Sequence, residues 1–225
     1  MTDADLWQAM KEIGAVWEHS GNPQAPHVVL RNNRRHSNGF VDTLQFLSNV
    51  SNLEVAAFAL AKKLSRKLEI KIDWVFGSPM AGIPFATANA RHMRARKIGF
   101  TEKVDGKLIC RFDIPPGNNF LIIEEMTTTG RTPQRSINAV LEKNPEAVPL
   151  DVVGAFLIRC DDHPPELLGR EIISLVSLPK LGINYSEWTE AECPLCQTGS
   201  MAIDNCKRVW KSLLRTMWEP TCAIA

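Results

Sequence analysis

Apolar and polar segments alternate along the chain and predict helices and strands in turn. Residues 3–18 carry apolar side chains at helical spacing, and the breaker sequence 21–23 ends that pattern. The stretch 53–68 predicts a longer helix, capped by Ser51 or Asn52, with cations gathered in its last turns. Both patterns are typical of helices that bury one apolar face.

Short apolar runs predict buried strands between and after these helices. Their ranges are 27–30, 74–76, 98–101, 108–112, 120–123, 152–158 and 172–176. Helical patterns over 83–94 and 133–142 alternate with them. Apolar runs without polar alternation are typical of parallel sheets covered on both faces. We therefore predict a doubly wound, mainly parallel α/β fold.

The ends of the chain differ from this pattern. The stretch 31–39 is polar and basic, so we expect an exposed loop there. The tail 186–225 is rich in Trp, Cys and Pro, with a final helix expected over 204–217. We predict a core domain over 1–185, including an N-terminal hood segment, and a C-terminal appendage over 186–225 packed on that core.

Composition and charge narrow the class of protein. The 225 residues are 44% hydrophobic and 23% charged, which is ordinary for a globular protein, and the net charge of +1 gives no reason to expect a nucleic-acid or membrane partner. No apolar run approaches the roughly 20 residues that a membrane helix needs. The first residues are acidic, unlike a signal peptide. Six scattered cysteines favour a reduced, cytoplasmic setting.

The segment 120–133 carries the clearest chemical signal. A buried apolar strand ends at two carboxylates, Glu124 and Glu125, and a loop of small hydroxyl residues follows. A helix then begins at once, with Thr132 as the expected N-cap and Pro133 as its first residue. Ligands of parallel sheets bind outside the carboxyl ends of the strands, so this segment predicts a binding site.

The loop between strand and helix suits a phosphate. Backbone N–H groups at a helix N-terminus bind anions, the hydroxyls of Thr128, Thr129 and Thr132 add donors, and Gly130 permits a close approach. The two glutamates are acceptors that suit the vicinal hydroxyls of a sugar. Together these groups predict a ribose 5-phosphate site. The plainer alternative is a solvated acidic corner without a ligand, and the absence of Gly-Lys-Ser/Thr excludes a Walker loop.

The same string resembles the phosphoribosyl pyrophosphate (PRPP) signature of type I phosphoribosyltransferases. That signature has four apolar residues, a Glu/Asp-Asp pair and a Thr-Thr-Gly loop. Other segments resemble, in order, the family's pyrophosphate loop and four segments of orotate phosphoribosyltransferases. They are 73–84 for the pyrophosphate loop, then 35–40, 100–103, 157–160 and the Cys-Pro-Leu-Cys tail at 191–199.

The resemblance implies an orotate-type enzyme, a homodimer that uses PRPP, a nucleobase-like acceptor and Mg²⁺. The implied PRPP-binding residues are Glu124, Glu125, Thr127, Thr128, Thr129, Gly130, Arg131 and Thr132. The implied pyrophosphate loop is Ser78, Pro79, Met80, Ala81 and Gly82. Lys103 joins the two glutamates as a catalytic residue, beside the leaving pyrophosphate. Arg159 would meet the substrate carboxylate, or else form a surface ion pair, and Arg35 and His36 would face the substrate.

Several departures from the family pattern keep other functions open. Glu125 replaces the usual Asp, Ala81 a Gly, and Arg131 a small residue. The catalytic loop offers few cations, with Lys107 and Arg111 the main ones beside Lys103. A PRPP-binding regulatory or catalytically impaired protein is the second hypothesis, and a transferase for another base is the third.

The cysteines of the tail raise a separate question. Cys193 and Cys196 have the two-residue spacing of half a zinc site. Cys206 and Cys222 can supply two further ligands, although the family tail carries this motif as a structural feature. Zinc at Cys193 and Cys196 is thus an alternative to a purely structural tail.

Overall fold

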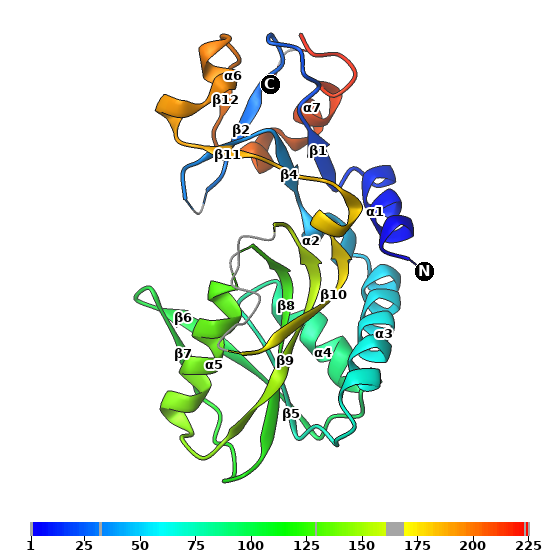
Figure 1. Cartoon of the computed structure of the whole chain (residues 1–225), viewed down its shortest axis with the longest axis vertical. Helices are drawn as coiled ribbons and strands as arrows, with labels where there is room; N and C mark the ends of the chain where they lie inside the picture. Colours follow the sequence, from blue (N-terminus) through cyan, green and yellow to red (C-terminus); the bar gives the residue numbers. More distant parts are fainter. Residues whose placement is uncertain (1, 32, 129, 161–168, 223, 225) are drawn as a thin grey trace. The chain divides into compact units, whose positions relative to one another are not determined.

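The computed structural model describes residues 2–31, 33–128, 130–160, 169–222 and 224. The chain divides into two compact units (Figure 1). The sheet unit comprises Met1–Trp7 and Phe46–Ile183, and the terminal unit comprises Gln8–Gln45 and Asn184–Ala225. The domain boundary expected at residue 185 stays a prediction. In this grouping Gln8–Gln45 belongs with the tail, whereas the sequence pattern placed it in the core domain.

The sheet unit is built on six strands in the order β10-β9-β8-β5-β6-β7. Their bounds are Trp74–Gly77 (β5), Lys97–Val104 (β6), Lys107–Cys110 (β7), Asn119–Thr127 (β8), Val148–Ile158 (β9) and Glu171–Ser177 (β10). Neighbouring strands run parallel, apart from the antiparallel β6–β7 hairpin at one edge. The prediction of a mainly parallel α/β sheet is therefore confirmed.

Helices cover both faces of this sheet (Figure 1). The helices are α3 (Val50–Lys67), α4 (Gly82–His92) and α5 (Arg131–Lys143), and a 3₁₀ turn, η1, spans Pro179–Leu181. On one face, Ile137 of α5 joins a buried cluster with Phe76 and Phe120. On the other, a Cβ added at Gly154 would meet Leu64 of α3, and α4 packs beside α3. Apolar residues on both faces explain why the strands show no polar alternation.

The terminal unit contains two small sheets. One pairs β1 (Val16–Glu18) with β4 (Gly39–Val41), and the other has the order β11-β3-β2-β12. The bounds of the latter are Glu187–Trp188 (β11), His36–Ser37 (β3), His27–Val29 (β2) and Ala202–Ile203 (β12). Its short helices are η2 (Glu190–Glu192), α6 (Pro194–Gln197), η3 (Cys206–Val209) and α7 (Trp210–Arg215). Trp17, Val28, Ile203, Trp210 and Leu213 belong to its core.

Some expected boundaries were wrong. The first helix, α1 (Asp3–Glu12), is shorter than expected, because Gly14 adopts a left-handed φ of +72° and Val16–Glu18 pairs as a strand. α3 begins earlier than expected, with the Asn49 side chain accepting the Asn52 N–H. The final helical pattern divides into η3 and the short α7. A short helix, α2, spans Thr43–Leu47.

The stretch 31–39 is also not simply an exposed loop. His36 and Ser37 form β3 and are buried.

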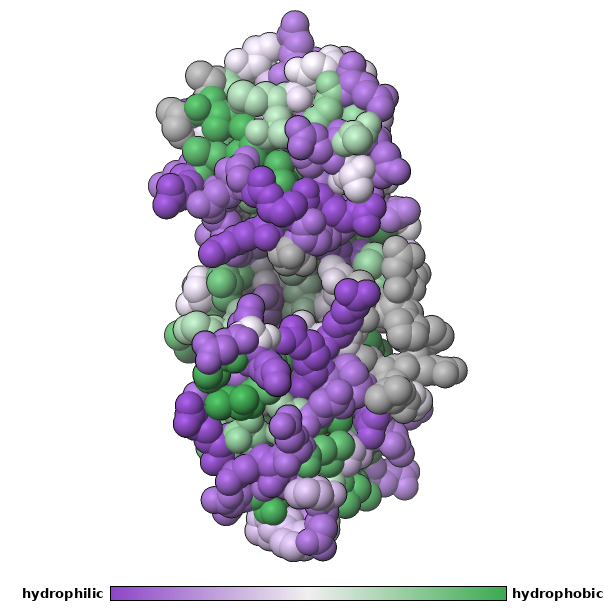
Figure 2. Space-filling model, turned by 90° about the vertical axis from the view of Figure 1, so that its left-hand side faces the viewer, coloured by the Kyte–Doolittle hydropathy of each residue, from purple (hydrophilic) through white to green (hydrophobic). Residues whose placement is uncertain are grey.

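On the face drawn in Figure 2, hydrophilic side chains dominate and apolar ones lie in small separate groups among them. Among the described residues, no helix has the length and apolar character that crossing a membrane requires.

Candidate functional site

The centre of the sheet, where β5 and β8 lie side by side, is a topological switch point. From β5 the chain crosses to β6 on one side, and from β8 it proceeds through β9 to β10 on the other. Gly77 is opposite Ile123 in the parallel register, so Ser78 and Glu124 follow on neighbouring strands at the same level. A crevice outside the carboxyl ends of the strands at such a point is where open α/β sheets bind ligands.

A buried polar network lies beneath this point. Ser78 Oγ donates a short hydrogen bond to Glu124 Oε1 and lies 2.8 Å from Ser136 Oγ, which is 3.2 Å from Thr101 Oγ1. All four side chains are buried. Each hydroxyl carries one proton, so the bond from Ser78 to the carboxylate leaves Ser136 as the donor to Ser78. The network thus orients its hydroxyls toward Glu124.

The same burial sets the charge of Glu124. Burial raises the pKa of Glu124 to about 8, the hydrogen bond from Ser78 acts against that rise, and the charge of Glu125 adds to it. Near neutral pH this carboxyl therefore holds its proton for most of the time. Glu125, the next residue of the strand, is only half-buried, and successive side chains of a strand point to opposite faces.

Glycines bring the loop after β5 close to β8. A Cβ at Gly82 would lie 3.2 Å from the Ile123 carbonyl oxygen and 3.7 Å from Glu124 Oε2. At Gly77, an added Cβ would approach Ile83 Cα to 2.7 Å. Ala81, the residue that departs from the usual Gly-Gly, precedes α4 in a right-handed conformation, which any residue adopts. The loop 78–82 therefore tolerates Ala81. Gly77, just before it, has no room for a Cβ, and a Cβ at Gly82 would be tight against the Ile123 carbonyl.

The loop after β8 leads directly into α5. Thr127 is buried, and its Oγ1 accepts the Gly130 N–H at 3.1 Å. The expected N-cap was wrong: α5 begins at Arg131 after Gly130, whose φ is +64°, and Thr132 lies in its first turn. No side chain of the described residues caps this N-terminus. The first amides of α5 are thus available to an anion. Thr129 lies outside the described residues.

Other predicted site residues follow neighbouring strands. Arg159 follows β9, is 7% exposed, and donates its backbone N–H to the Thr127 carbonyl at 3.0 Å. Lys103 lies exposed on the β6–β7 hairpin. In the same hairpin, Arg111 Nε donates to Glu102 at 2.8 Å. The sheet edge thus brings together the loop 78–82, the β8–α5 loop and Arg159.

Sequence patterns did not single out two members of the network. Ser136 lies on the buried face of α5 and Thr101 inside β6. The available signal was a serine at an apolar position of a helical pattern, which is weak without a structure. A cavity of about 510 Å³ in the sheet unit is lined by Trp74, Arg94 and Phe112 among others, and by none of the predicted site residues.

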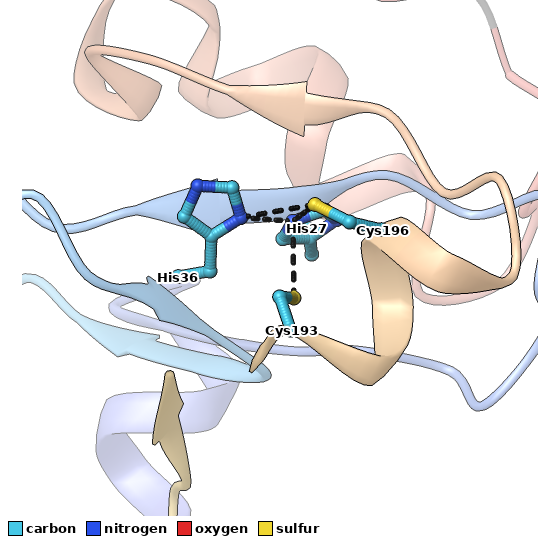
Figure 3. A group of neighbouring side chains, drawn as sticks. All are labelled: His27, His36, Cys193 and Cys196. Carbon is cyan, nitrogen blue, oxygen red and sulfur yellow. Dashed lines mark hydrogen bonds between the residues drawn. The ribbon is translucent and has the colours of Figure 1, made fainter. Parts of the chain in front are cut away.

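The remaining predicted residues belong to the terminal unit. Arg35 is exposed, whereas His36 is buried and its Nδ1 lies 2.8 Å from His27 Nε2. His27, His36, Cys193 and Cys196 offer ligand atoms that all lie within 4.8 Å of one another (Figure 3).

The two other cysteines considered as metal ligands lie outside this group. Cys206 packs in the apolar core of the terminal unit, and neither Cys206 nor Cys222 belongs to the group. Burial is the main cause that lowers the pKa of His27, and the nearby His36 and His19 lower it further, to about 4. This imidazole is therefore neutral near pH 7.

Comparison with known proteins relates most of the chain to one group of enzymes. It is 32% identical over 150 residues to an orotate phosphoribosyltransferase of Erythrobacter litoralis, an alignment covering 66% of this chain and 73% of that protein. It is 29% identical over 213 residues to the enzyme of the same name from Wolinella succinogenes, covering 90% and 97%. No protein-family model matches the chain.

Solved structures show the same fold. The orotate phosphoribosyltransferase of Aeropyrum pernix superposes with a TM-score of 0.57 at 21% identity, covering 78% of this chain and 98% of that one. The Mycobacterium tuberculosis enzyme of that name, in complex with Fe(III) dicitrate, gives a TM-score of 0.59 at 17% identity, covering 80% and 99%. The chain therefore shares the fold of these enzymes.

Proposed function

Because the chain belongs to the orotate phosphoribosyltransferase family and has the type I phosphoribosyltransferase fold, we propose that it transfers the phosphoribosyl group of PRPP to orotate or an orotate-like base. A ring nitrogen of the base bonds to C1 of the ribose and gives up its proton to solvent, and the bond from C1 to the pyrophosphate oxygen breaks. The electron pair of that bond leaves with the pyrophosphate. One observation carries the proposal: the register of β5 and β8 brings the two predicted loops together at the switch point.

In this proposal the β8–α5 loop binds the 5-phosphate of PRPP. The amides at the start of α5 and the hydroxyls of Thr128, Thr129 and Thr132 donate to it, with Thr127 and Gly130 shaping the loop. Arg131, exposed in the first turn, adds a positive charge. This set of donors suits a dianion because each contact is to an N–H, an O–H or a cation.

The two glutamates bind the ribose. Glu125 accepts from one hydroxyl, and Glu124, with its pKa of about 8, can donate as well as accept. Gly82 leaves room beside Glu124 Oε2, since a Cβ there would lie 3.7 Å from that oxygen. Holding the ribose in one orientation supplies much of the catalysis in a reaction whose transition state is a positively charged sugar.

The site at the carboxyl ends of the strands suits a Mg²⁺ ion that arrives bound to PRPP. Mg²⁺ prefers one or two carboxylates together with substrate phosphates to a cage of protein ligands. Within the described part of the chain, the only group of three or more metal-binding side chains is in the terminal unit. Because Glu124 holds its proton near neutral pH, Glu125 and the substrate oxygens would hold the ion, and it would neutralise charge on the leaving pyrophosphate.

The remaining roles follow from position. The loop 78–82 donates backbone groups to the pyrophosphate, and Lys103 supplies a cation beside it. Arg159, whose planar fork matches a carboxylate, orients the base. The expectation that Arg35 faces the substrate stays a prediction, whereas His36 is buried beside His27 and is not part of this proposal. We also propose that the protein acts in the cytoplasm as a homodimer, and light scattering of the purified protein tests the homodimer.

One observation favours a second function. Of the few cations in the β6–β7 hairpin, Arg111 is already hydrogen-bonded to Glu102. A leaving pyrophosphate with fewer cations around it is less well stabilised. A hairpin with few available cations is what we expect of a protein that binds PRPP for regulation and turns it over slowly.

One assay separates the two functions. The protein is incubated with Mg²⁺, PRPP and orotate, and orotate absorbance is followed over time. Consumption that requires all three components supports transfer. Tight PRPP binding without turnover favours the regulatory function, and absence of both contradicts the site. Arg159→Lys raises the KM for orotate, and Arg215→Lys, at an exposed position of α7, is the control.

A further inference from the structure

We propose that the terminal unit binds one zinc ion through His27, His36, Cys193 and Cys196 (Figure 3). The site is separate in chemistry from the phosphoribosyl site, and the proposal does not depend on the function of the sheet edge. The two histidines come from the adjacent strands β2 and β3. Cys193 directly precedes α6, and Cys196 lies within it.

The spacing of the ligand atoms fits a tetrahedral ion. Cys196 Sγ lies 3.2 Å from His36 Nδ1 and 3.5 Å from His27 Nε2, and Cys193 Sγ lies 3.7 Å from His27 Nε2. With Zn–S near 2.3 Å and Zn–N near 2.0–2.1 Å, a tetrahedron places sulfur and nitrogen about 3.6 Å apart. The two nitrogens, at 2.8 Å, need to separate by only about half an ångström to reach their tetrahedral distance.

A second layer of hydrogen bonds fixes the tautomer of His27. Ser200 Oγ donates its proton to the Ala25 carbonyl at 2.6 Å, so it can only accept from His27 Nδ1, 2.8 Å away. His27 Nδ1 therefore carries the ring proton, and Nε2 presents its lone pair to the cysteines and His36. A histidine ligand whose other nitrogen donates to a polar group is the usual arrangement at zinc.

Burial distinguishes this group from a chance surface cluster. His27 and Cys193 are 0% exposed and His36 is 5% exposed. Cys196 is half-buried beside them. Buried polar side chains that converge in this way cost free energy unless something satisfies all of them. A cation does so, because it accepts every lone pair at once and stabilises both thiolates.

The donor set selects the kind of ion. Two thiolates and two imidazoles in a closed tetrahedral arrangement are typical of zinc, whereas Mg²⁺ and Ca²⁺ prefer oxygen. All four atoms lie within 4.8 Å of one another, which suits one shared ion; an iron–sulfur cluster would divide the ligands between two irons. Four protein ligands leave no open position, so the ion is structural.

The fold explains what such an ion would do. It joins β2 and β3, near residue 30, to α6, near residue 195, and so connects the two chain segments of the terminal unit. The strands of this unit are two or three residues long. Small units with limited cores commonly use a metal as an additional cross-link.

Elemental analysis of the full-length protein tests the site. Purified protein supplied with zinc is expected to hold one zinc per chain after gel filtration, and Cys196→Ser to lose most of it. Cys222→Ser, outside the group, is expected to keep it. Equal zinc in the wild type and Cys196→Ser overturns the proposal, as does a disulfide between Cys193 and Cys196 in protein purified without reductant.

A second measurement covers the case in which the variant fails to fold. Wild-type protein is stripped of metal and loaded with Co²⁺, which reports coordination by its spectrum. Intense visible bands of tetrahedral cobalt with a thiolate-to-cobalt charge-transfer band are expected, and they should disappear on adding one equivalent of zinc. Weak octahedral bands without charge transfer overturn the proposal.

Discussion

The sheet unit and the terminal unit build their sites in opposite ways. In the sheet unit, one unbroken segment supplies strand, carboxylates, loop and helix, and a parallel neighbour adds Ser78. In the terminal unit, four ligands converge from positions about 160 residues apart. The first site rests on a large apolar core, and the second lies among short strands. Local sequence thus determines the first site, whereas long-range pairing determines the second.

The largest effect is expected in the core of the sheet unit. Phe76→Ala removes a fully buried ring that packs between α5 and the sheet, and should destabilise the protein by about 3–5 kcal/mol. Urea unfolding followed by far-ultraviolet circular dichroism measures it. Phe58→Ala, 58% exposed on α3, is the control with a small effect. A loss no larger than that of Phe58→Ala would contradict the place of Phe76 in the core.

A smaller effect is expected at the phosphate loop. Gly130→Ala forces a side chain into a left-handed conformation, at a cost of about 1–2 kcal/mol. Gly182→Ala is the matched control, because Gly182 also has a left-handed φ, of +71°, and no atom lies near its added Cβ. Both should lower the unfolding midpoint, but only Gly130→Ala should also weaken PRPP binding in calorimetry. Equal PRPP affinities in the two variants would show that Gly130 has no part in PRPP binding.

The pH dependence of stability sharpens the description of Glu124. Its pKa is raised from 4.5 to about 8 in the folded state, so folding favours the protonated form. The stability associated with that proton is present below pH 4.5 and is lost as pH rises toward 8. Glu124→Gln should therefore gain stability relative to the wild type between pH 5 and about pH 8. Thermal unfolding across this range measures the trend, with Glu142→Gln on the exposed side of α5 as control; a flat difference would mean that Glu124 is charged when folded.

The smallest effect is expected at the surface of the terminal unit. Arg34 donates to both carboxylate oxygens of Asp204 at 2.7 Å, but both side chains are exposed. Exposed ion pairs contribute little because water and salt screen them. Arg34→Ala should leave the unfolding midpoint, followed by tryptophan fluorescence, nearly unchanged. If Arg34→Ala lowered the unfolding midpoint as much as removal of the metal does, this ion pair rather than the metal would hold the two chain segments together.

Much of the sheet unit could be predicted from sequence because its signals are local. The apolar run before Glu124 and the glycine-containing loop after it lie within fourteen residues, and β8 and α5 formed there. The error at the N-cap arose because Gly130 adopts a positive φ, which starts the helix two residues earlier than the preference of Thr132 suggests.

The terminal unit was harder to predict because its elements depend on distant partners. Helical periodicity favoured a helix through Val16, yet β1 forms by pairing with β4 about 25 residues later. His36 lies in a polar stretch, and it is buried where β3 pairs with β2 on one side and with β11 on the other. The spacing of Cys193 and Cys196 indicated half of a metal site, but nothing local pointed to His27 and His36 as the other half.

The central claim is that the loop between β8 and α5 binds PRPP. Calorimetric titration of Mg²⁺ and PRPP into the wild type, Thr128→Ala and Thr221→Ala tests it most directly, since Thr221 is an exposed threonine of the terminal unit. Binding of one PRPP per chain is predicted, about tenfold weaker in Thr128→Ala after loss of a hydrogen bond to a charged group, and unchanged in Thr221→Ala. Equal affinity in all three proteins, or no binding by the wild type, would contradict the account.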